Sequence, residues 1–182
     1  MAKNIRDAAA VDFKVAEKDG SLVGPGIDGL HLIRPVNHTD HRGSLFEIYD
    51  ADPEKWPDPV VWIYQTSLYP GVIKGWFVHE HKTDRYTLAS GTVLTCFYDG
   101  REDSPTFGNT MHATLSARGF RQAVIPVGVW HLTANVGPDE VLLLNFPTVG
   151  HNHDTPDRRG LPWNTDLIPL DVRALLPANW SA

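Results

Sequence analysis

Short apolar and β-branched runs, each closed by a turn, repeat along most of this chain and restrict the folds it can adopt. Its 182 residues include 15 glycines and 14 prolines, which interrupt the sequence too often for long helices. From Leu30 onward we predict about ten strands, whose close spacing is typical of a sandwich or jelly roll. The predicted strands are Leu30–Arg34, Leu45–Tyr49, Val60–Ser67, Val72–Val78, Arg85–Ala89, Thr92–Tyr98, Ala113–Leu115, Gln122–Ile125, Leu132–Ala134 and Val141–Phe146. The fold class is therefore expected to be all-β.

The two ends of the chain differ from this pattern. Residues 1–28 lack clear periodicity and contain three glycines and a proline close together, so we expect an N-terminal arm. The following residues, 29–182, are few enough for a single domain, and 42% of the whole chain is apolar, which is enough to bury a core. Near the C-terminus, Asp171–Leu176 favours a short helical segment.

Composition excludes several classes of partner. The net charge is −6, and no group of Lys and Arg residues exceeds the pair Arg158–Arg159, so a nucleic-acid partner is not expected. An anionic small molecule remains compatible with a local basic group. Because no apolar run resembles a signal peptide or reaches the length of a membrane span, we expect a soluble, cytoplasmic protein. The single cysteine, Cys96, lies in an apolar run and is expected to be buried and unreactive.

Two histidine-containing segments are the strongest indication of a functional site. In the first, Pro126 and Gly128 precede His131 in a P-x-G-x-x-H pattern, where proline fixes φ and glycine can adopt a positive φ. In the second, His79 and His81 are two residues apart, so in an extended segment both would point to the same face. If that face is the interior of a barrel, the three imidazoles converge in one cavity.

These histidines admit two kinds of chemistry. A neutral histidine is a competent general base near pH 7, and a carboxylate such as Asp84 or Asp166 could fix its tautomer. Alternatively, His79, His81, His131 and Asp84 form a set of three nitrogen ligands and one oxygen ligand, which suits a divalent transition metal. No cofactor is expected in the first case. The histidines of a further group, His151–Asp154, are predicted to lie in a solvated loop.

Both histidine segments together resemble the signature of the cupin superfamily, and three more segments resemble the dTDP-4-dehydrorhamnose 3,5-epimerase family within it. Asp40–Glu47 is similar to the family's D-x-R-G-x-x-x-E segment, Gly71–Gly75 to its G-V-L-R-G strand, and Asp99–Gly108 to its D-x-R-x-x-S-P-T-F-G loop. The resemblance extends from about Asp40 to Asp171. It implies a cupin-type jelly roll (a double-stranded β-helix) that forms a homodimer.

The resemblance also implies roles for individual residues. Arg42 and Lys74 occupy positions that contact the nucleotide pyrophosphate in the family, and Glu47 occupies the position that contacts the base. Lys74 replaces an arginine, so it would keep the charge but lose the planar fork that binds phosphate in two places. Trp76 and Arg101 are further candidates for substrate contacts.

The proton-transfer residues of the family are not reproduced. Its general base is expected at Phe77 and its general acid at Leu144, and neither side chain can transfer a proton. His131 does match a family histidine, and Asp166 lies near the position of the carboxylate that orients the usual base. His79, two residues after Phe77, is the candidate for a displaced base.

Three functions therefore remain open at this point. The first is a sugar-nucleotide epimerase or isomerase that acts on a nucleoside-diphosphate 4-keto-6-deoxysugar or a related ligand, with His79 or His131 as proton carrier. The second is a metal-dependent cupin enzyme, and the third is a catalytically silent protein that only binds its ligand. A homodimer is expected in each case, since Val60–Ile63 and Val141–Leu144 are apolar on both faces and need a cover, either a second subunit or the arm.

Overall fold

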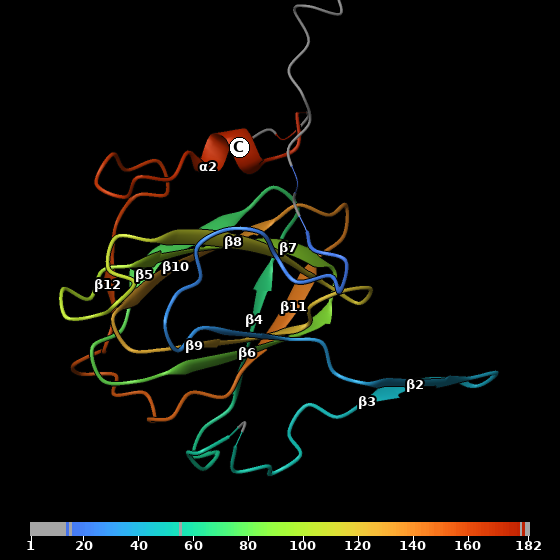
Figure 1. The fold of residues 1–182 in the computed structure, drawn as a ribbon. Coiled ribbons are helices and arrows are strands. Elements are labelled where there is room, and N and C mark those ends of the chain that lie inside the picture. The colour runs from blue at the N-terminus through green and yellow to red at the C-terminus, as the bar shows by residue number, and fades with distance from the viewer. Residues whose placement is uncertain (1–13, 15, 55, 179, 181–182) are drawn as a thin grey trace, which may run out of the picture.

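Two five-stranded antiparallel sheets face each other in the computed structural model, which describes residues 14, 16–54, 56–178 and 180 (Figure 1). The first sheet runs in the order β1 (His31–Ile33), β9 (Gln122–Ile125), β6 (Asp84–Ser90), β11 (Val141–Asn145) and β4 (Tyr64–Leu68). The second runs in the order β12 (Arg159–Gly160), β5 (Ile73–Val78), β10 (Val129–Asn135), β7 (Thr92–Asp99) and β8 (Thr110–Ser116). This arrangement confirms the predicted all-β jelly roll.

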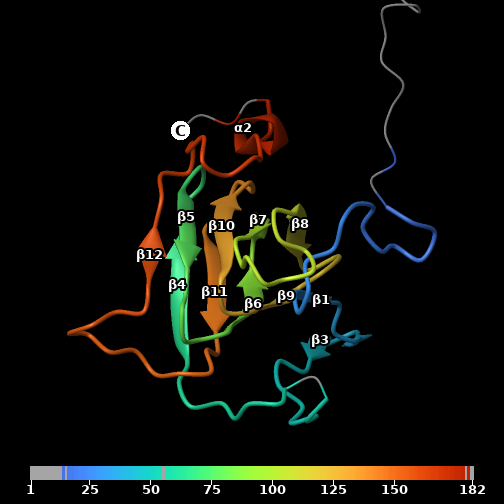
Figure 2. The ribbon, with the colours of Figure 1, turned by 60° about the vertical axis from the view of Figure 1, so that its left-hand side comes forward.

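A hairpin of β2 (Asn37–Asp40) and β3 (Gly43–Phe46) projects from the barrel, on the side away from β5 and β12 (Figures 1 and 2). The sequence analysis missed β2 because its four residues are polar and exposed, so no alternation of apolar residues marks it. Three large apolar side chains on or near this hairpin are exposed: Val36 (72%), Leu45 (62%) and Tyr49 (42%).

The ends of the chain agree in outline with the prediction. The helix α2 (Val172–Leu175) lies in the segment expected to be helical, and the Asp171 carboxylate caps it by accepting the Ala174 N–H at 3.1 Å. Residues 1–13 and 15 of the expected arm lie outside the described residues. At the end of that segment, Ile27 is buried in the core. Within the described part of the chain, no helix is long and apolar enough to cross a membrane.

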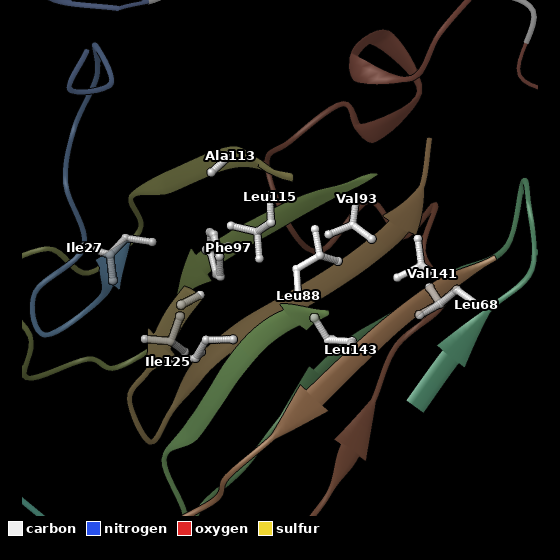
Figure 3. Close-up of a cluster of buried hydrophobic side chains, with 12 residues drawn as sticks. Ile27, Leu68, Leu88, Val93, Phe97, Ala113, Leu115, Ile125, Val141 and Leu143 are labelled. Carbon is white, nitrogen blue, oxygen red and sulfur yellow. The ribbon is translucent and has the colours of Figure 1, made fainter. Parts of the chain in front are cut away.

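The main core fills the space between the sheets, with side chains from β4, β6, β9 and β11 of the first sheet and β7, β8 and β10 of the second (Figure 3). Its fully buried members include Leu88, Phe97 and Leu115, which point from both sheets toward the interior (Figure 3). On the outer face of the second sheet, α2 covers a smaller apolar cluster that contains Cys96 and Trp76. Cys96 is fully buried, as predicted, and burial raises the pKa of its thiol to about 12.

Strands β5 and β10 pair with one irregularity that affects the site. Phe77 lies opposite His131, whereas Lys74 lies opposite Thr133, so three steps along β5 match two along β10. Both Lys74 and Phe77 can therefore face the same cavity although they are three residues apart. Gly75, between them, has φ +122°, and a Cβ there would lie 2.7 Å from the His131 carbonyl oxygen. Only glycine fits this close approach of the two backbones.

Candidate active site

A cavity of about 590 Å³ opens between the two sheets next to the main core, with which it shares Leu68 and Leu143. From the first sheet, the wall takes Tyr64, Thr66, Leu68, Asp84, Tyr86 and Leu143, and the segment before β4 adds Trp62. From the second sheet and the loop after β5, it takes Lys74, Phe77, His79, Lys82, His131 and Thr133. A loop near the mouth adds His151, His153, Pro156, Asp157 and Arg158. The wall thus combines apolar and aromatic side chains with a few polar groups, as small-molecule sites do.

His79, Asp84 and His131 meet at the inner wall of this cavity. Asp84 Oδ2 lies 3.2 Å from His79 Nε2 and 3.6 Å from His131 Nε2, and Asp84 Oδ1 lies 3.6 Å from Lys82 Nζ. All four side chains are buried, with Asp84 only 1% exposed. The sequence analysis expected both histidines in one cavity, and the structure brings them together around a carboxylate.

The backbone fixes the tautomers of both imidazoles. His79 Nδ1 contacts the carbonyl oxygen of Asp157, and His131 Nδ1 lies 3.2 Å from that of Val129. A carbonyl oxygen can only accept a hydrogen bond, so each Nδ1 carries the hydrogen. In the neutral rings, each Nε2 then directs a lone pair toward Asp84 and the cavity.

Burial and charge act in opposite directions on this cluster. Burial alone would raise the pKa of Asp84, but its contacts with His79, His131 and Lys82 hold that pKa well below its usual range. For His131 burial prevails over the attraction of Asp84 and lowers the pKa to about 4, so this ring is neutral near pH 7. The site therefore holds a permanent carboxylate beside a neutral imidazole.

The expectation that His79 and His81 face the same side is wrong, because β5 ends at Val78 and the chain turns before β6. The Asp157 carboxylate stabilises this turn by accepting the N–H groups of Glu80 at 2.8 Å and His81 at 3.0 Å. Burial would raise the pKa of Asp157, but these N–H groups lower it. The His81 side chain is exposed and does not line the cavity.

The P-x-G-x-x-H turn has the predicted backbone: Gly128 adopts φ +80° and its N–H donates to the His79 carbonyl at 2.9 Å. Arg101 lies against this turn, because a Cβ on Gly128 would lie 2.6 Å from Arg101 Cγ. The Arg101 guanidinium pairs with the Asp99 carboxylate at 2.8 Å. Arg101 was expected to contact substrate, but it lies outside the cavity wall and supports the turn that precedes His131.

Two other expected site residues also lie elsewhere. Trp76 alternates to the opposite face of β5, where it is 1% exposed beneath α2 and its indole N–H donates to the Trp163 carbonyl at 3.2 Å. Asp166 is exposed and lines a separate surface hollow formed by residues 163–173. Of the two carboxylates considered for the position beside the histidines, Asp84 lies there and Asp166 does not.

Arg42 and Glu47 do not reach the cavity of their own chain. Both are exposed on or next to the β2–β3 hairpin, and Arg42 pairs with Asp40 of the same hairpin. Besides Lys82, which lies beside Asp84, the basic groups at the cavity are Lys74, which was predicted, and Arg158, which was not. Lys74 Nζ donates to Thr66 Oγ1 at 2.8 Å, and the Arg158 guanidinium lies over the Phe77 ring at 4.7 Å.

Two tyrosines in the cavity were also missed. Strand β11 pairs with β4 and β6 so that Asn145 lies between Tyr64 on one side and Tyr86 on the other. In antiparallel sheets, residues paired in this way project from the same face, so these three form a row across three strands. Leu144, at which the family's acid was expected, alternates to the other face of β11, and Leu143 lines the cavity instead.

The histidine-containing loop 151–154 is exposed, but it lies at the mouth of the cavity rather than apart from it. The His151 ring stacks on Trp62 with centroids 5.5 Å apart, and His153 meets His151 edge-on at 4.5 Å. Trp62 in turn lies 4.7 Å from the Tyr64 ring. This rim of aromatic rings could stack on a flat or apolar part of a ligand.

The cluster at the inner wall also fits a metal ion. One ligand atom each from His79, Asp84 and His131 lies within 4.8 Å of the other two. Ligands about 2.1 Å from a common ion lie about 3 to 3.5 Å apart, near the observed separations of 3.2 and 3.6 Å. Both Nδ1 atoms face backbone carbonyls, which is the usual second contact of a metal-bound histidine. Lys82 disfavours metal binding, because its positively charged ammonium group already lies beside Asp84 and would repel a cation.

Comparison with known proteins places this geometry in context. Residues 25–177 match the sequence profile of the dTDP-4-dehydrorhamnose 3,5-epimerase family. The probable low-salt glycan biosynthesis epimerase Agl13 of Haloferax volcanii is 31% identical over 138 residues, which cover 75% of this chain and 88% of that protein. The spore coat polysaccharide biosynthesis protein SpsL of Bacillus subtilis is 31% identical over 142 residues, which cover 78% of this chain and 93% of that protein.

Solved structures with the same fold include a dTDP sugar isomerase from Desulfovibrio desulfuricans G20, with 25% identity and a TM-score of 0.73 over 80% of this chain and 91% of that one. Another is an epimerase from Legionella pneumophila crystallised with dTDP-4-keto-L-rhamnose. It has 22% identity and a TM-score of 0.72, and the match covers 82% of this chain and 81% of that one.

Proposed function

The chain belongs to the dTDP-4-dehydrorhamnose 3,5-epimerase family, and from this premise we propose that it acts as an epimerase or isomerase on a nucleoside-diphosphate 4-keto-6-deoxysugar. The observation that carries the proposal is the His79–Asp84–His131 cluster at the inner wall of the cavity. It supplies a proton carrier in a chain that has Phe77 at the family's usual position for the base. The complex of the Legionella enzyme with a dTDP-4-keto sugar supports this class of ligand.

We assign the general base to His79. Its Nδ1–H is directed to the Asp157 carbonyl, so Nε2 keeps a lone pair that can accept a proton from a carbon next to the C4 ketone. Asp84, 3.2 Å away, then stabilises the resulting imidazolium. His131 is neutral and buried beside the same carboxylate, so it serves as a neighbouring polar contact or a second carrier.

For the diphosphate we propose anchoring by Lys74 and Arg158 at the cavity wall, completed by Arg42 from a second subunit. Arg42 lies on the β2–β3 hairpin, which projects away from the barrel (Figure 1), and Glu47 follows β3 directly. In a homodimer the hairpin of one protomer could reach the cavity of its partner. The apolar side chains of Val61 and Ile63, 55% and 53% exposed beside the edge strand β4, would gain a cover in such a dimer.

Deuterium exchange tests the proposed reaction. With dTDP-4-keto-6-deoxyglucose in D₂O, NMR should detect slow uptake of deuterium at C3 or C5, and His79→Ala should reduce it about 10²- to 10⁴-fold. The matched control is His31→Ala, which removes an exposed imidazole on β1. Calorimetry with dTDP should show binding to the wild type and to both variants. Absence of both exchange and dTDP binding in the wild type would refute the proposal.

A second candidate function is that of a metal-dependent cupin enzyme. The specific observation in its favour is that neither oxygen of Asp84, nor His131 Nε2, has a hydrogen-bond partner among the described residues, although all three atoms are buried. His79, His131 and Asp84 would hold the ion, and the ion would polarise a carbonyl or carboxylate of the substrate. His81 is not part of this ligand set.

Elemental analysis of untagged protein separates the two candidates. Under the epimerase proposal we expect metal to be absent or substoichiometric. About one transition metal ion per chain, lost in His131→Ala but kept in the control His81→Ala, would instead favour the metal-dependent enzyme.

A further inference from the structure

Tyr64 lines the cavity and carries a phenolic proton that it can donate. Reversal of configuration at a carbon next to a ketone needs a base on one side of the sugar ring and an acid on the other. His131 and the segment leading to His79 belong to the second sheet, whereas Tyr64 belongs to β4 of the first. All three side chains line the same cavity, so a ring bound there would lie between base and phenol.

The hydrogen bonds of Asn145 leave the Tyr64 proton available. The Asn145 side-chain oxygen accepts the Arg85 backbone N–H at 2.9 Å, which fixes the orientation of the amide. Its Nδ2 therefore donates to the Tyr64 hydroxyl oxygen at 2.8 Å. Because the hydroxyl is the acceptor in this bond, its own hydrogen is free to be donated to a group in the cavity.

The same amide would stabilise the phenolate left after proton transfer. The pKa of Tyr64 is raised, because burial and the nearby Asp84 charge outweigh the Asn145 hydrogen bond and the charge of Arg158, which lower it. Tyr86, on the other side of Asn145, is a weaker candidate. Its ring meets His131 edge-on at 5.8 Å, and burial and Asp84 raise its pKa well above the ordinary value.

We propose that Tyr64 is the general acid of this enzyme, presented from β4 instead of from β11, where the family's acid was expected. The inference rests on the proposed function. His79 Nε2 takes the proton as the C–H bond breaks, and the electron pair moves into the enolate. The Tyr64 O–H bond then breaks as a new C–H bond forms on the opposite face of the ring. Solvent at the mouth returns a proton to the phenolate and removes one from the imidazolium.

The test separates exchange from inversion in Tyr64→Phe, with Tyr69→Phe as the control because Tyr69 is 68% exposed. With dTDP-4-keto-6-deoxyglucose in D₂O, Tyr64→Phe should still exchange a carbon-bound proton through His79. Its production of epimer should fall about 10²- to 10⁴-fold. Binding of dTDP should stay within about twofold of the wild type, since the hydroxyl is assigned to no diphosphate contact.

Incorporation of a fluorotyrosine at position 64 is the second measurement. It lowers the pKa of the phenol with little change of shape, so the alkaline limb of the epimerisation profile should move to lower pH. Epimerisation by Tyr64→Phe at the wild-type rate, or a pH profile unmoved by fluorotyrosine, would overturn the assignment while leaving the proposed function intact. A wild type that neither exchanges nor epimerises would overturn both.

Discussion

At the scale of single residues, the central feature of the cavity is that the His131 imidazole is neutral although it lies beside the Asp84 carboxylate. His131 is 2% exposed, and burial lowers its pKa to about 4 even though the negative charge of Asp84 favours the protonated ring. The protein therefore favours the form of His131 that carries a free lone pair at Nε2. This preference links the folding stability to pH, because the unfolded chain has no such environment.

We expect the free energy of unfolding to fall as the pH is lowered from about 6.5 to 4. In this interval the unfolded chain protonates His131, whereas the folded protein does not, so protons favour the unfolded state. Across this interval the free energy of unfolding should fall by about 3 kcal/mol. Urea denaturation at several pH values measures the effect, and His131→Gln should flatten the curve relative to His31→Gln.

Below this pH interval, protonation of Asp84 lowers the free energy of unfolding further. Its pKa is depressed in the folded protein, so its contribution is present above its ordinary pKa and disappears as the pH falls further. A stability that is unchanged between pH 6.5 and 4, with no difference between the two histidine variants, would show that His131 is not held neutral.

At the scale of the elements, the contact between β5 and β10 sets the shape of the site. Gly75 lets the two strands approach closely at the irregularity that turns Lys74 and Phe77 to the cavity. In Gly75→Ala the new methyl group would meet the His131 carbonyl and Leu132 Cα, each at 2.7 Å, at a φ of +122°. Backbone rather than a flexible side chain would have to move.

We expect Gly75→Ala to destabilise the protein by about 2 kcal/mol or more and to weaken dTDP binding. The control is Gly26→Ala, where a Cβ has no neighbour within 4 Å and φ is not positive. Thermal denaturation and calorimetry measure both effects. Equal melting temperatures for the two variants would contradict the close approach of β5 and β10.

The strands themselves were largely predictable from local patterns, and the site was predictable only in part. Apolar runs and the P-x-G-x-x-H turn located β4 to β11 and the convergence of His79 with His131. The role of Asp157 in bending the chain after Val78 depends on a contact across 77 residues, which no local pattern reveals. Likewise, Tyr64 joins the site through its register with Asn145, and register is a property of paired strands.

At the scale of the whole molecule, the β2–β3 hairpin is the part that a single chain leaves unexplained. The hairpin projects from the barrel (Figure 2), its Leu45 is exposed, and it carries Arg42. The hairpin is exposed except at Phe46, over whose ring the Arg121 guanidinium lies at 3.9 Å, and a two-stranded hairpin with so little packing is marginally stable in water. A second copy of the chain would both cover it and bring Arg42 to a cavity.

Mixing experiments should therefore restore activity between two inactive variants. If the hairpin serves the partner's cavity, Arg42→Ala and His79→Ala are each impaired alone, but a mixed dimer contains one site with both wild-type residues. Light scattering should give the mass of a dimer, and the unfolded and refolded mixture should recover up to about a quarter of the wild-type activity. A monomeric mass, or no recovery on mixing, would contradict this arrangement.

The complete burial of Cys96 allows the protein to be labelled at an introduced cysteine. Cys96 is the single cysteine, it is 0% exposed, and burial makes its thiolate unfavourable, so thiol reagents have no native target in the folded protein. A cysteine introduced at Ser44, on the exposed hairpin, could be labelled without removing Cys96. If two copies of the chain form a dimer, spin labels at that single position would report the distance between the two hairpins in a protein with its natural core.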